Sequence, residues 1–413
     1  MPTLAPHIFS VPPSGIRRIF EIAVELDDVI SLAVGEPDLA VAPHILAAGA
    51  QAWIADDTNY TANGGISTLR RALVEKLALE NHLRVDIEQV WVTVGATQAL
   101  HQALTLLLSA GDEVLVPDPG YTTFTMTARM LDATPVPYTL RPERDFAPSI
   151  DELDRLVTEK TRVLIVNSPS NPLGTVLSEV QLRELLDFAR RHDLWVLSDE
   201  VYEYFTYGAS HVSIASLDTE NRVFSVFSLS KTYALTGARV GYLVTPPGLA
   251  PIMRSVQEAA VSCVNSPAQR AAIAAVTGEH QHVAAAKDHY RGNLDAARVL
   301  LDVHGVHYLV PTGAFYLWID MSHVTEGDVA NWAERFLLHE RVAVAPGSAF
   351  GRAGEGWIRI CLAANRAQLL EGLSRLPAPS PPVPVALTLG TTDAAEHRQP
   401  VANADGSTTV GEL

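Results

Sequence analysis

The chain has 413 residues, of which 47% are hydrophobic and 19% charged, a balance typical of a globular protein with a sizeable core. Its formal net charge of -17 disfavours nucleic acid and an anionic membrane surface as partners. The two cysteines, Cys263 and Cys361, are too few for a disulfide framework and lack the spacing of metal ligands. Neither a signal-peptide pattern nor an apolar run of about 18 residues is present. We therefore expect a cytoplasmic protein without a metal site.

Short apolar runs alternate with longer helical patterns through the middle of the chain. The predicted strands are 90–94, 113–116, 162–166, 194–197, 223–227 and 240–244. Such alternation predicts an α/β domain with a mostly parallel sheet. Most of these strands end at a residue suited to chemistry, and the carboxyl ends of parallel strands border the crevice where ligands bind.

The pattern changes beyond about residue 276, where a smaller α+β region is predicted. It contains helices around 283–303 and 329–340 and strands at 314–319 and 357–362. Residues 377–413 combine clustered prolines with Gly, Thr, Ala and Asp and show no periodicity, so we expect a flexible tail. The predicted divisions are an N-terminal segment 1–45 that joins the small domain, a large domain 46–275, a small domain 276–376 and the tail.

A lysine loop is the most informative motif. Lys231 lies beside Ser228 and Ser230 and is followed by Gly237 and Arg239. The chain has four lysines and 26 arginines, so arginine supplies most of its positive charge. A desolvated lysine amine can be neutral and attack an aldehyde, which a guanidinium cannot do. Ser-Lys alone is also common in surface turns, so the accompanying motifs decide its meaning.

Polar residues follow two of the predicted strands. Asp199 comes after the run 194–197, and Tyr202 stands three residues later. A buried carboxylate needs a partner, which a protonated pyridine nitrogen would supply, although a helix cap or turn is an alternative. Asn171 lies in an Asn-Pro-Leu-Gly loop after the strand 162–166, where proline and glycine fix a tight turn.

Residues suited to anions stand elsewhere in the chain. Ala96 and Thr97 lie where a strand, a small-residue turn and a helix start would aim backbone N–H groups at an anion. The planar guanidinium of Arg239 suits bidentate contact with phosphate. Tyr121 follows a strand and would stack on a flat ring or pack in the core. Arg359 alternates with apolar neighbours, so it would need a substrate carboxylate or an acidic neighbour.

Taken in order, these motifs resemble the pyridoxal-phosphate enzymes of the class I and II aminotransferases, the aspartate-aminotransferase family of fold type I. The resemblance covers roughly residues 10–375. Its further elements are Gly35-Glu-Pro-Asp38, Tyr60-Thr-Ala-Asn-Gly64, Pro311–Tyr316 and Ala345–Gly351. It implies a large domain with a mostly parallel sheet of the seven-stranded type, sandwiched by helices, and a smaller α+β domain.

The resemblance also implies the roles of individual residues. Lys231 would form the Schiff base with pyridoxal 5'-phosphate and carry a proton, Asp199 would pair with the ring nitrogen, and Tyr202 would donate to the ring hydroxyl oxygen. Asn171 would donate to the same oxygen, and Tyr121 would stack on the ring. The residues implied to contact the phosphate are Ala96, Thr97, Ser228, Ser230, Arg239 and, from the neighbouring subunit of a homodimer, Tyr60.

Substrate binding is implied for Gly35, Asn171 and Arg359, with Arg359 as the clamp for the α-carboxylate. The expected reaction moves an amino group between an L-amino acid and a 2-oxo acid by a ping-pong route, with glutamate and 2-oxoglutarate as the expected pair. No second arginine in the sequence stands out as a clamp for a side-chain carboxylate, so the other substrate stays open.

The same residues would also serve a lyase, a decarboxylase or an oxidase that acts on an amino acid. One departure from the family pattern bears on this alternative: Ala238 stands where many relatives carry a large aromatic residue. A second departure, Leu39 where an aromatic residue is usual, would change the wall of the pocket. A cofactor-binding regulator is a third possibility. Such relatives carry a DNA-binding domain, which we do not expect here because the enzyme-like segment begins near residue 10.

Overall fold

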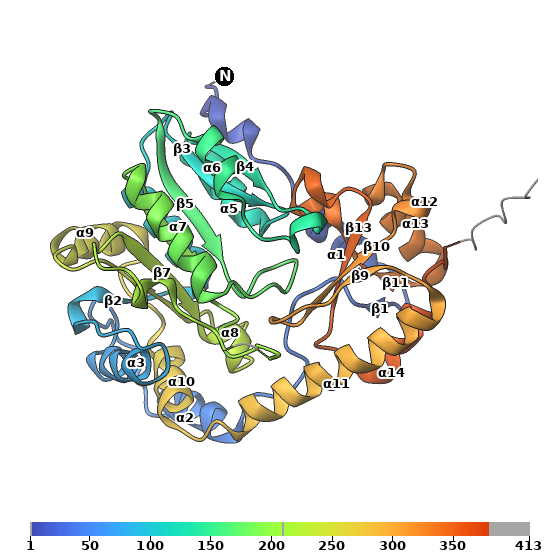
Figure 1. The fold of residues 1–413 in the computed structure, drawn as a ribbon. Helices are drawn as coiled ribbons and strands as arrows, with labels where there is room; N and C mark the ends of the chain where they lie inside the picture. Colours follow the sequence, from blue (N-terminus) through green and yellow to red (C-terminus); the bar gives the residue numbers. More distant parts are fainter. Residues whose placement is uncertain (1, 209, 380–413) are drawn as a thin grey trace, which may run out of the picture. The chain divides into compact units, whose positions relative to one another are not determined.

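The computed structural model describes residues 2–208 and 210–379, and a seven-stranded sheet forms its centre. The strands are β2 (Val90–Thr93), β3 (Glu113–Asp118), β4 (Thr134–Thr139), β5 (Thr161–Asn167), β6 (Trp195–Asp199), β7 (Val223–Ser228) and β8 (Gly241–Val244). Their order is β2-β8-β7-β6-β5-β3-β4, and only β8 runs antiparallel to its neighbours. The predicted α/β fold with a mostly parallel sheet is confirmed (Figure 1).

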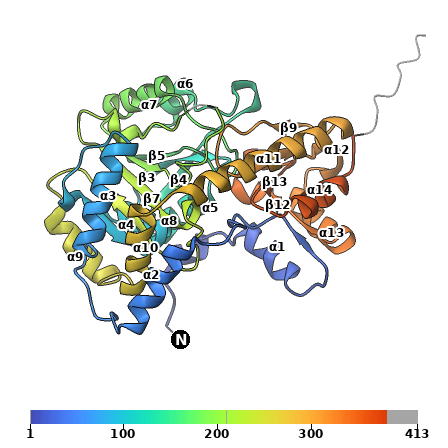
Figure 2. The ribbon, with the colours of Figure 1, turned by 90° about the horizontal axis from the view of Figure 1, so that it is seen from below.

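Apolar side chains point alternately to the two faces of the central strands, which explains why helices cover both faces of the sheet. Leu164 and Val166 of β5 pack in one apolar cluster with residues of α6 (Ile150–Leu156) and α7 (Glu179–Arg191). Val163 and Ile165 pack in another cluster with α4 (Gly95–Leu107) and α5 (Thr122–Met130). Successive side chains of a strand point to opposite faces, so a continuous apolar run needs cover on both sides. Figure 2 shows α6 and α7 on one side of β3, β5 and β7, and α4 on the other.

Strand β4 was not predicted from the sequence. It contains Pro135 and Pro137, which cannot donate backbone hydrogen bonds, and such residues argue against a strand in the middle of a sheet. In the structure β4 lies at the edge of the sheet, where it pairs only with β3 among the described strands. An edge strand tolerates proline because one of its sides faces no partner.

Further helices accompany this sheet. They are α2 (Pro43–Ile54), α3 (Ser67–Glu80), α8 (Leu229–Thr232), α9 (Ala250–Ala260) and α10 (Ser266–Thr277). Asn265 caps α10 by accepting a hydrogen bond from the Ala268 backbone N–H, and Pro267 lies in its first turn. Ser178 and Gln181 form a capping box at the start of α7.

A four-stranded antiparallel sheet forms the second part of the molecule. Its order is β12-β13-β10-β9, with β9 (Tyr308–Leu309), β10 (Tyr316–Asp320), β12 (Ala345–Pro346) and β13 (Trp357–Cys361). The helices that accompany it are α11 (Gln281–His304), α12 (Ser322–Thr325), α13 (Val329–Glu340) and α14 (Arg366–Ser374). The strands and helices predicted beyond residue 276 are confirmed.

The N-terminal residues lie against this second part. Strand β1 (Ile30–Ser31) pairs in parallel with β11 (Val342–Ala343), and helix α1 (Gly15–Ala23) packs near α13 and β12 (Figure 1). The described residues up to 379 form one compact unit, so the predicted boundaries at 45/46 and 275/276 stay predictions. The predicted tail lies outside the described residues from 380 onward.

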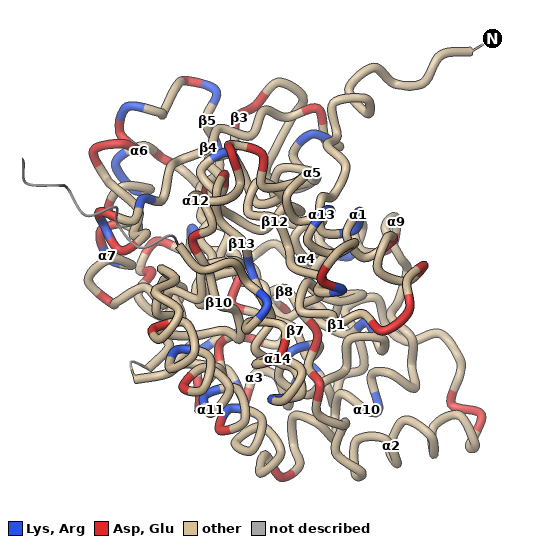
Figure 3. Tube along the Cα trace, turned by 90° about the vertical axis from the view of Figure 1, so that its right-hand side faces the viewer, with Lys and Arg blue, Asp and Glu red and all other residues tan. Residues whose placement is uncertain are grey.

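Opposite charges lie close together along α7. Arg183 pairs with Glu179 at 2.7 Å and Arg190 with Asp187 at 3.0 Å, and Figure 3 shows blue and red segments side by side in this region. Exposed pairs of this kind add little stability but limit the size of single-sign surfaces. In the part of the chain that the structure describes, no helix has both the length and the apolar character needed to span a membrane.

Candidate active site

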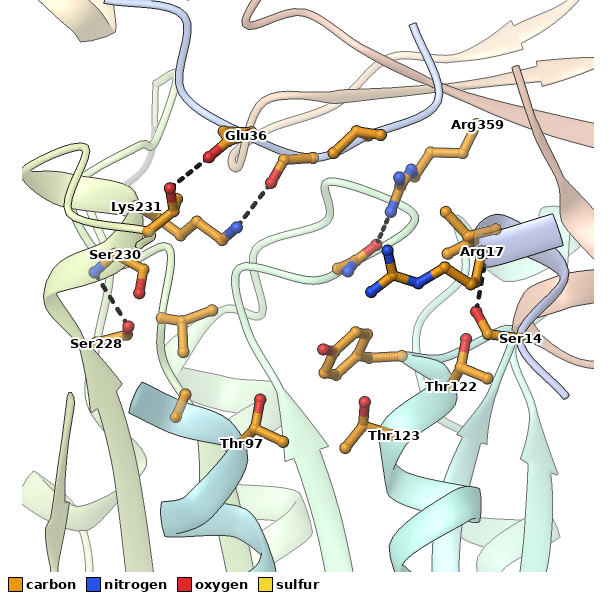
Figure 4. Close-up of a pocket in the computed structure, with 18 of the residues that line it drawn as sticks. Ser14, Arg17, Glu36, Thr97, Thr122, Thr123, Ser228, Ser230, Lys231 and Arg359 are labelled. Carbon is orange, nitrogen blue, oxygen red and sulfur yellow. Dashed lines mark hydrogen bonds between the residues drawn. The ribbon is translucent and has the colours of Figure 1, made fainter. Parts of the chain in front are cut away.

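A cavity of about 970 Å³ lies at the carboxyl ends of β5, β6 and β7. Every predicted site residue except Tyr60 lines it: Gly35, Ala96, Thr97, Tyr121, Asn171, Asp199, Tyr202, Ser228, Ser230, Lys231, Arg239 and Arg359. Figure 4 shows Lys231 and Arg359 extending into it from opposite sides. The fold therefore brings residues from the whole length of the chain to the crevice predicted for a parallel sheet.

Lys231 lies on the short helix α8, directly after β7. Ser228, the last residue of β7, accepts a hydrogen bond from the Ser230 backbone N–H at 3.1 Å and fixes the start of this helix. The Lys231 Nζ donates to the Gly35 carbonyl oxygen at 2.7 Å. Burial lowers the pKa of the amine to about 8, and the positive charges of Arg359 and Arg239 act in the same direction. The amine can therefore be neutral close to neutral pH.

Asp199 is the last residue of β6 and is 3% exposed. Its Oδ1 accepts a hydrogen bond from the Val201 backbone N–H at 3.3 Å. Burial raises the pKa of the Asp199 carboxyl to about 7, although the Val201 hydrogen bond opposes this shift. A buried carboxyl of this kind is stabilised in its charged form by a cation, and a protonated pyridine nitrogen is one.

Arg359 lies on β13 and is 2% exposed. Its Nη1 donates to Asn171 Oδ1 at 2.8 Å, and its Nη2 donates to the Ala33 carbonyl oxygen. The guanidinium carbon lies 4.2 Å from the centre of the Tyr316 ring and 4.9 Å from that of Phe350. Within residues 2–208 and 210–379 these partners are neutral and the Nε has no hydrogen-bond acceptor. A buried arginine so surrounded is suited to an incoming carboxylate.

An anion site lies at the start of α4. Gly95 has φ +70°, and a Cβ atom there would lie 2.3 Å from the Arg239 Nη2. The helix has no side-chain cap, so the N–H groups of its first turn are open to the cavity next to Ala96 and Thr97. Arg239 is held by its Nη1, which donates to the Thr236 carbonyl oxygen at 3.0 Å. A guanidinium beside a helix N-terminus is suited to a phosphate group.

These three sites together fit pyridoxal phosphate. Lys231 presents an amine to the aldehyde of the cofactor, Asp199 a carboxyl to its ring nitrogen, and Arg239 a guanidinium to its phosphate. Tyr121 also lines the cavity, as the residue before α5. The absence of a side chain at Gly95 allows the Arg239 guanidinium to lie beside the start of α4, where a phosphate would bind.

Among the lining residues that the sequence analysis did not predict, Arg17 and Tyr316 are the most important for the chemistry of the site. Arg17 of α1 lines the cavity, and Tyr316 of β10 donates to or accepts from the Tyr202 hydroxyl at 2.6 Å. In α1 the apolar residues Ile16 and Ile19 face the core, so the sequence places Arg17 on the exposed face. That face borders the cavity, and only the tertiary structure could show it.

Tyr60 lies elsewhere. It stands between α2 and α3, is 91% exposed and does not line the cavity of its own chain. The expectation that it contacts the phosphate of a neighbouring subunit stays a prediction.

Comparison with known proteins identifies the family. Residues 27–376 match the family described as aminotransferase class I and II. The chain belongs to this family. The aspartate aminotransferase of Pyrococcus abyssi is 39% identical to it over 89% of this chain and 95% of the relative. The aromatic-amino-acid aminotransferase 2 of Thermococcus litoralis is 36% identical over 90% of this chain and 97% of the relative.

Solved structures agree. Aspartate aminotransferase from Thermus thermophilus with maleate has a TM-score of 0.86 and 33% identity, covering 91% of this chain and 99% of the other. The aromatic aminotransferase from Pyrococcus horikoshii has a TM-score of 0.81 and 37% identity, covering 87% and 97%. The fold is therefore that of the fold type I aspartate aminotransferases. The class I and II aminotransferase described here is a pyridoxal-phosphate-dependent enzyme that acts on amino acids and 2-oxo acids, as its sequence predicted.

The lowered pKa of Lys231 predicts a pH dependence for cofactor attachment. Because only the neutral amine attacks an aldehyde, attachment should increase as the pH rises through about 8. The measurement is covalent trapping of pyridoxal phosphate by cyanoborohydride, followed by mass spectrometry of the Lys231 peptide. Lys231→Ala is the control and should show no trapping at this position. A midpoint at the ordinary value of 10.5 would contradict the assigned environment.

Proposed function

We propose that this aminotransferase uses glutamate and 2-oxoglutarate as one substrate pair and works by a ping-pong route. The observation that carries the proposal is the convergence of Lys231, Asp199 and Arg359 on one cavity. In this proposal Lys231 is the covalent anchor and proton carrier, Asp199 holds the pyridine nitrogen, and Arg359 holds the substrate α-carboxylate. Gly35 and Asn171 complete the carboxylate site.

Each half-reaction then follows from the properties of the side chains. Pyridoxal phosphate, when bound, supplies an electron sink for the charge left on the substrate α-carbon. Lys231 can take a proton from that carbon and return it because its lowered pKa, about 8, allows both protonation states near neutral pH. Arg359 and Asn171, joined at 2.8 Å, hold the carboxylate and thereby orient the α-carbon toward the lysine.

The phosphate and the ring would be held by the remaining predicted residues. Ala96 and Thr97 would contribute N–H groups of α4, and Arg239 would neutralise the phosphate charge. Ser228 and Ser230 add hydroxyl groups at the start of α8. On the family resemblance, Tyr202 would donate to the ring hydroxyl oxygen and Tyr121 would stack on the ring.

The alternative reactions at the same site are not favoured. The relatives described above are named as aminotransferases of aspartate or aromatic amino acids, and none of those names describes a lyase, decarboxylase or oxidase. Those relatives also narrow the substrate class to amino acids with a second carboxylate or an aromatic ring.

Arg17 supports a dicarboxylic substrate. It lines the same cavity as Arg359, and Figure 4 shows its guanidinium pointing inward. Its neighbour Arg18 pairs with Glu334 at 3.2 Å, whereas the Arg17 guanidinium carbon lies 5.4 Å from the centre of the Phe20 ring. A second guanidinium in the cavity would bind the distal carboxylate of glutamate or 2-oxoglutarate.

Tyr60 supports a homodimer. Its ring is 91% exposed, and Trp53 and Ile54 at the end of α2 are also exposed, at 60% and 78%. A second copy of the chain that covers this region would bury apolar surface and bring Tyr60 to the partner's phosphate site.

The first prediction of this proposal concerns the visible spectrum. Glutamate added to the loaded enzyme without oxygen should bleach the visible band, and 2-oxoglutarate should restore it. Lys231→Ala should lower the rate of this change by about 100-fold or more because the proton carrier is lost. Release of ammonia or uptake of oxygen without need for a 2-oxo acid would instead support the alternative reactions.

The second prediction concerns Arg17. Arg17→Gln should lower kcat/KM for glutamate and aspartate by about 10- to 100-fold, because a charged hydrogen-bond donor is lost. The value for alanine or phenylalanine should change little. Arg183→Gln, which removes a cation paired with Glu179 on α7 outside the cavity, is the matched control. Equal losses for all substrates would show that Arg17 does not read the side chain.

A third experiment tests whether Tyr60 contacts the phosphate in its own chain or in the partner chain of a dimer. Tyr60→Phe should weaken cofactor binding by about 10-fold if the hydroxyl contacts phosphate. In a mixed dimer of a Tyr60→Phe chain and a Lys231→Ala chain, the site that keeps its lysine should receive an intact tyrosine from the partner. Wild-type cofactor affinity at that site is therefore expected, and a weakened affinity would place Tyr60 within its own chain.

A further inference from the structure

Tyr316 touches three parts of the site at once. It is the first residue of β10, is 1% exposed and lines the cavity. Its strand pairs antiparallel with β13, with Tyr316 opposite Cys361 and Trp318 opposite Arg359. Tyr316 and Arg359 are therefore diagonal neighbours on the same face of this sheet, close enough for long side chains to meet.

The ring of Tyr316 supports the guanidinium of Arg359. The guanidinium carbon lies 4.2 Å from the ring centre, and Phe350 provides a second ring at 4.9 Å. Attraction between a cation and an aromatic face strengthens where water is excluded, as it is around Arg359, which is 2% exposed. These rings restrict the guanidinium to the orientation in which Nη1 donates to Asn171.

The hydroxyl of Tyr316 faces the other half of the site. It lies 2.6 Å from the Tyr202 hydroxyl, and a Cβ atom at position 35 would lie 2.0 Å from it. Gly35 therefore leaves space that the hydroxyl requires. Burial raises the pKa of both tyrosines, so both hydroxyls keep their protons and can donate.

Each tyrosine hydroxyl has one proton to donate. If Tyr202 donates its proton to the cofactor ring oxygen, the hydrogen bond between the tyrosines must be donated by Tyr316. A donor that itself accepts a hydrogen bond is polarised and donates more strongly. The direction of the bond between the two hydroxyls therefore follows from the role of Tyr202.

We propose that Tyr316 is a positioning residue that links the carboxylate clamp to the donor for the ring oxygen. Its ring fixes the orientation of Arg359, and its hydroxyl donates to Tyr202 so that the Tyr202 proton is available to the cofactor. The inference rests on the roles proposed above for Arg359 and Tyr202.

The hydroxyl and the ring can be tested separately. Tyr316→Phe keeps the ring, so KM for glutamate should stay within about twofold. The midpoint of the pH titration of the bound cofactor's visible band should rise by about 0.5–1 unit, because the hydrogen bond from Tyr202 to the cofactor ring oxygen weakens. Tyr316→Leu also removes the ring and should raise KM by about 5- to 30-fold. An unchanged midpoint in Tyr316→Phe, or an unchanged KM in Tyr316→Leu, would overturn the corresponding half of the proposal.

A double-mutant cycle shows whether Tyr316 acts through Tyr202. In a Tyr202→Phe background, Tyr316→Phe should cause no further shift of the midpoint, since the intermediary is absent. A shift of the same size in both backgrounds would overturn the proposal. Tyr138→Phe is the matched control, because it removes a buried hydroxyl that donates to the Ile165 carbonyl oxygen outside the cavity. It should leave midpoint and KM unchanged, and equal effects in the control would assign Tyr316 a merely structural role.

The visible band distinguishes a wrong role for Tyr316 from a wrong proposed function. The midpoint reports on the loaded cofactor whether or not glutamate is the substrate. A wild-type enzyme with a titrating band and a Tyr316→Phe variant with the same midpoint would refute only the role of Tyr316. A wild-type protein that gives no band with added cofactor would refute the anchoring role of Lys231.

Discussion

Buried charge without an ionic partner is the constraint on which this site depends. Two buried acidic residues elsewhere have such partners: Glu203 lies 2.5 Å from Lys76, and Glu200 lies 2.9 Å from His211. Around the cavity, Arg359 has neutral partners among the described residues, and burial shifts the pKa values of Asp199 and Lys231 toward neutrality. Isolated charges are costly to bury, so a ligand that brings the opposite charges stabilises the site as it binds.

The sheet accounts for the arrangement of these charges. β5, β6 and β7 end side by side, at Asn167, Asp199 and Ser228, so one edge of the sheet presents an amide loop, a carboxyl and the start of the lysine helix. Helix α4 adds its N-terminus at the same edge. Arg359, the proposed carboxylate clamp, comes from β13 in the second sheet, and Arg17 comes from α1, which packs against the same part of the fold.

The sequence predicted the elements whose signals are local. Apolar runs with buried faces gave six strands of the main sheet, whereas β4 was missed because its prolines indicate a turn until its edge position is known. The site residues next to strand ends were brought together as expected. Arg17 and Tyr316 were not assigned roles, since one depends on where α1 lies and the other on the register between β10 and β13. The contact expected of Tyr60 involves a second chain.

The hydrogen bonds of Arg359 and Lys231 join distant parts of the polypeptide. Arg359 donates to the carbonyl oxygen of Ala33, 326 positions away, and Lys231 donates to that of Gly35, 196 positions away. Contacts of such separation slow folding, because the intervening chain must first be ordered. At ribosomal rates, the 128 residues from Lys231 to Arg359 take on the order of ten seconds to synthesise. A nascent chain can therefore form the strands around Lys231 before it contains Arg359, the residue proposed to hold the substrate carboxylate.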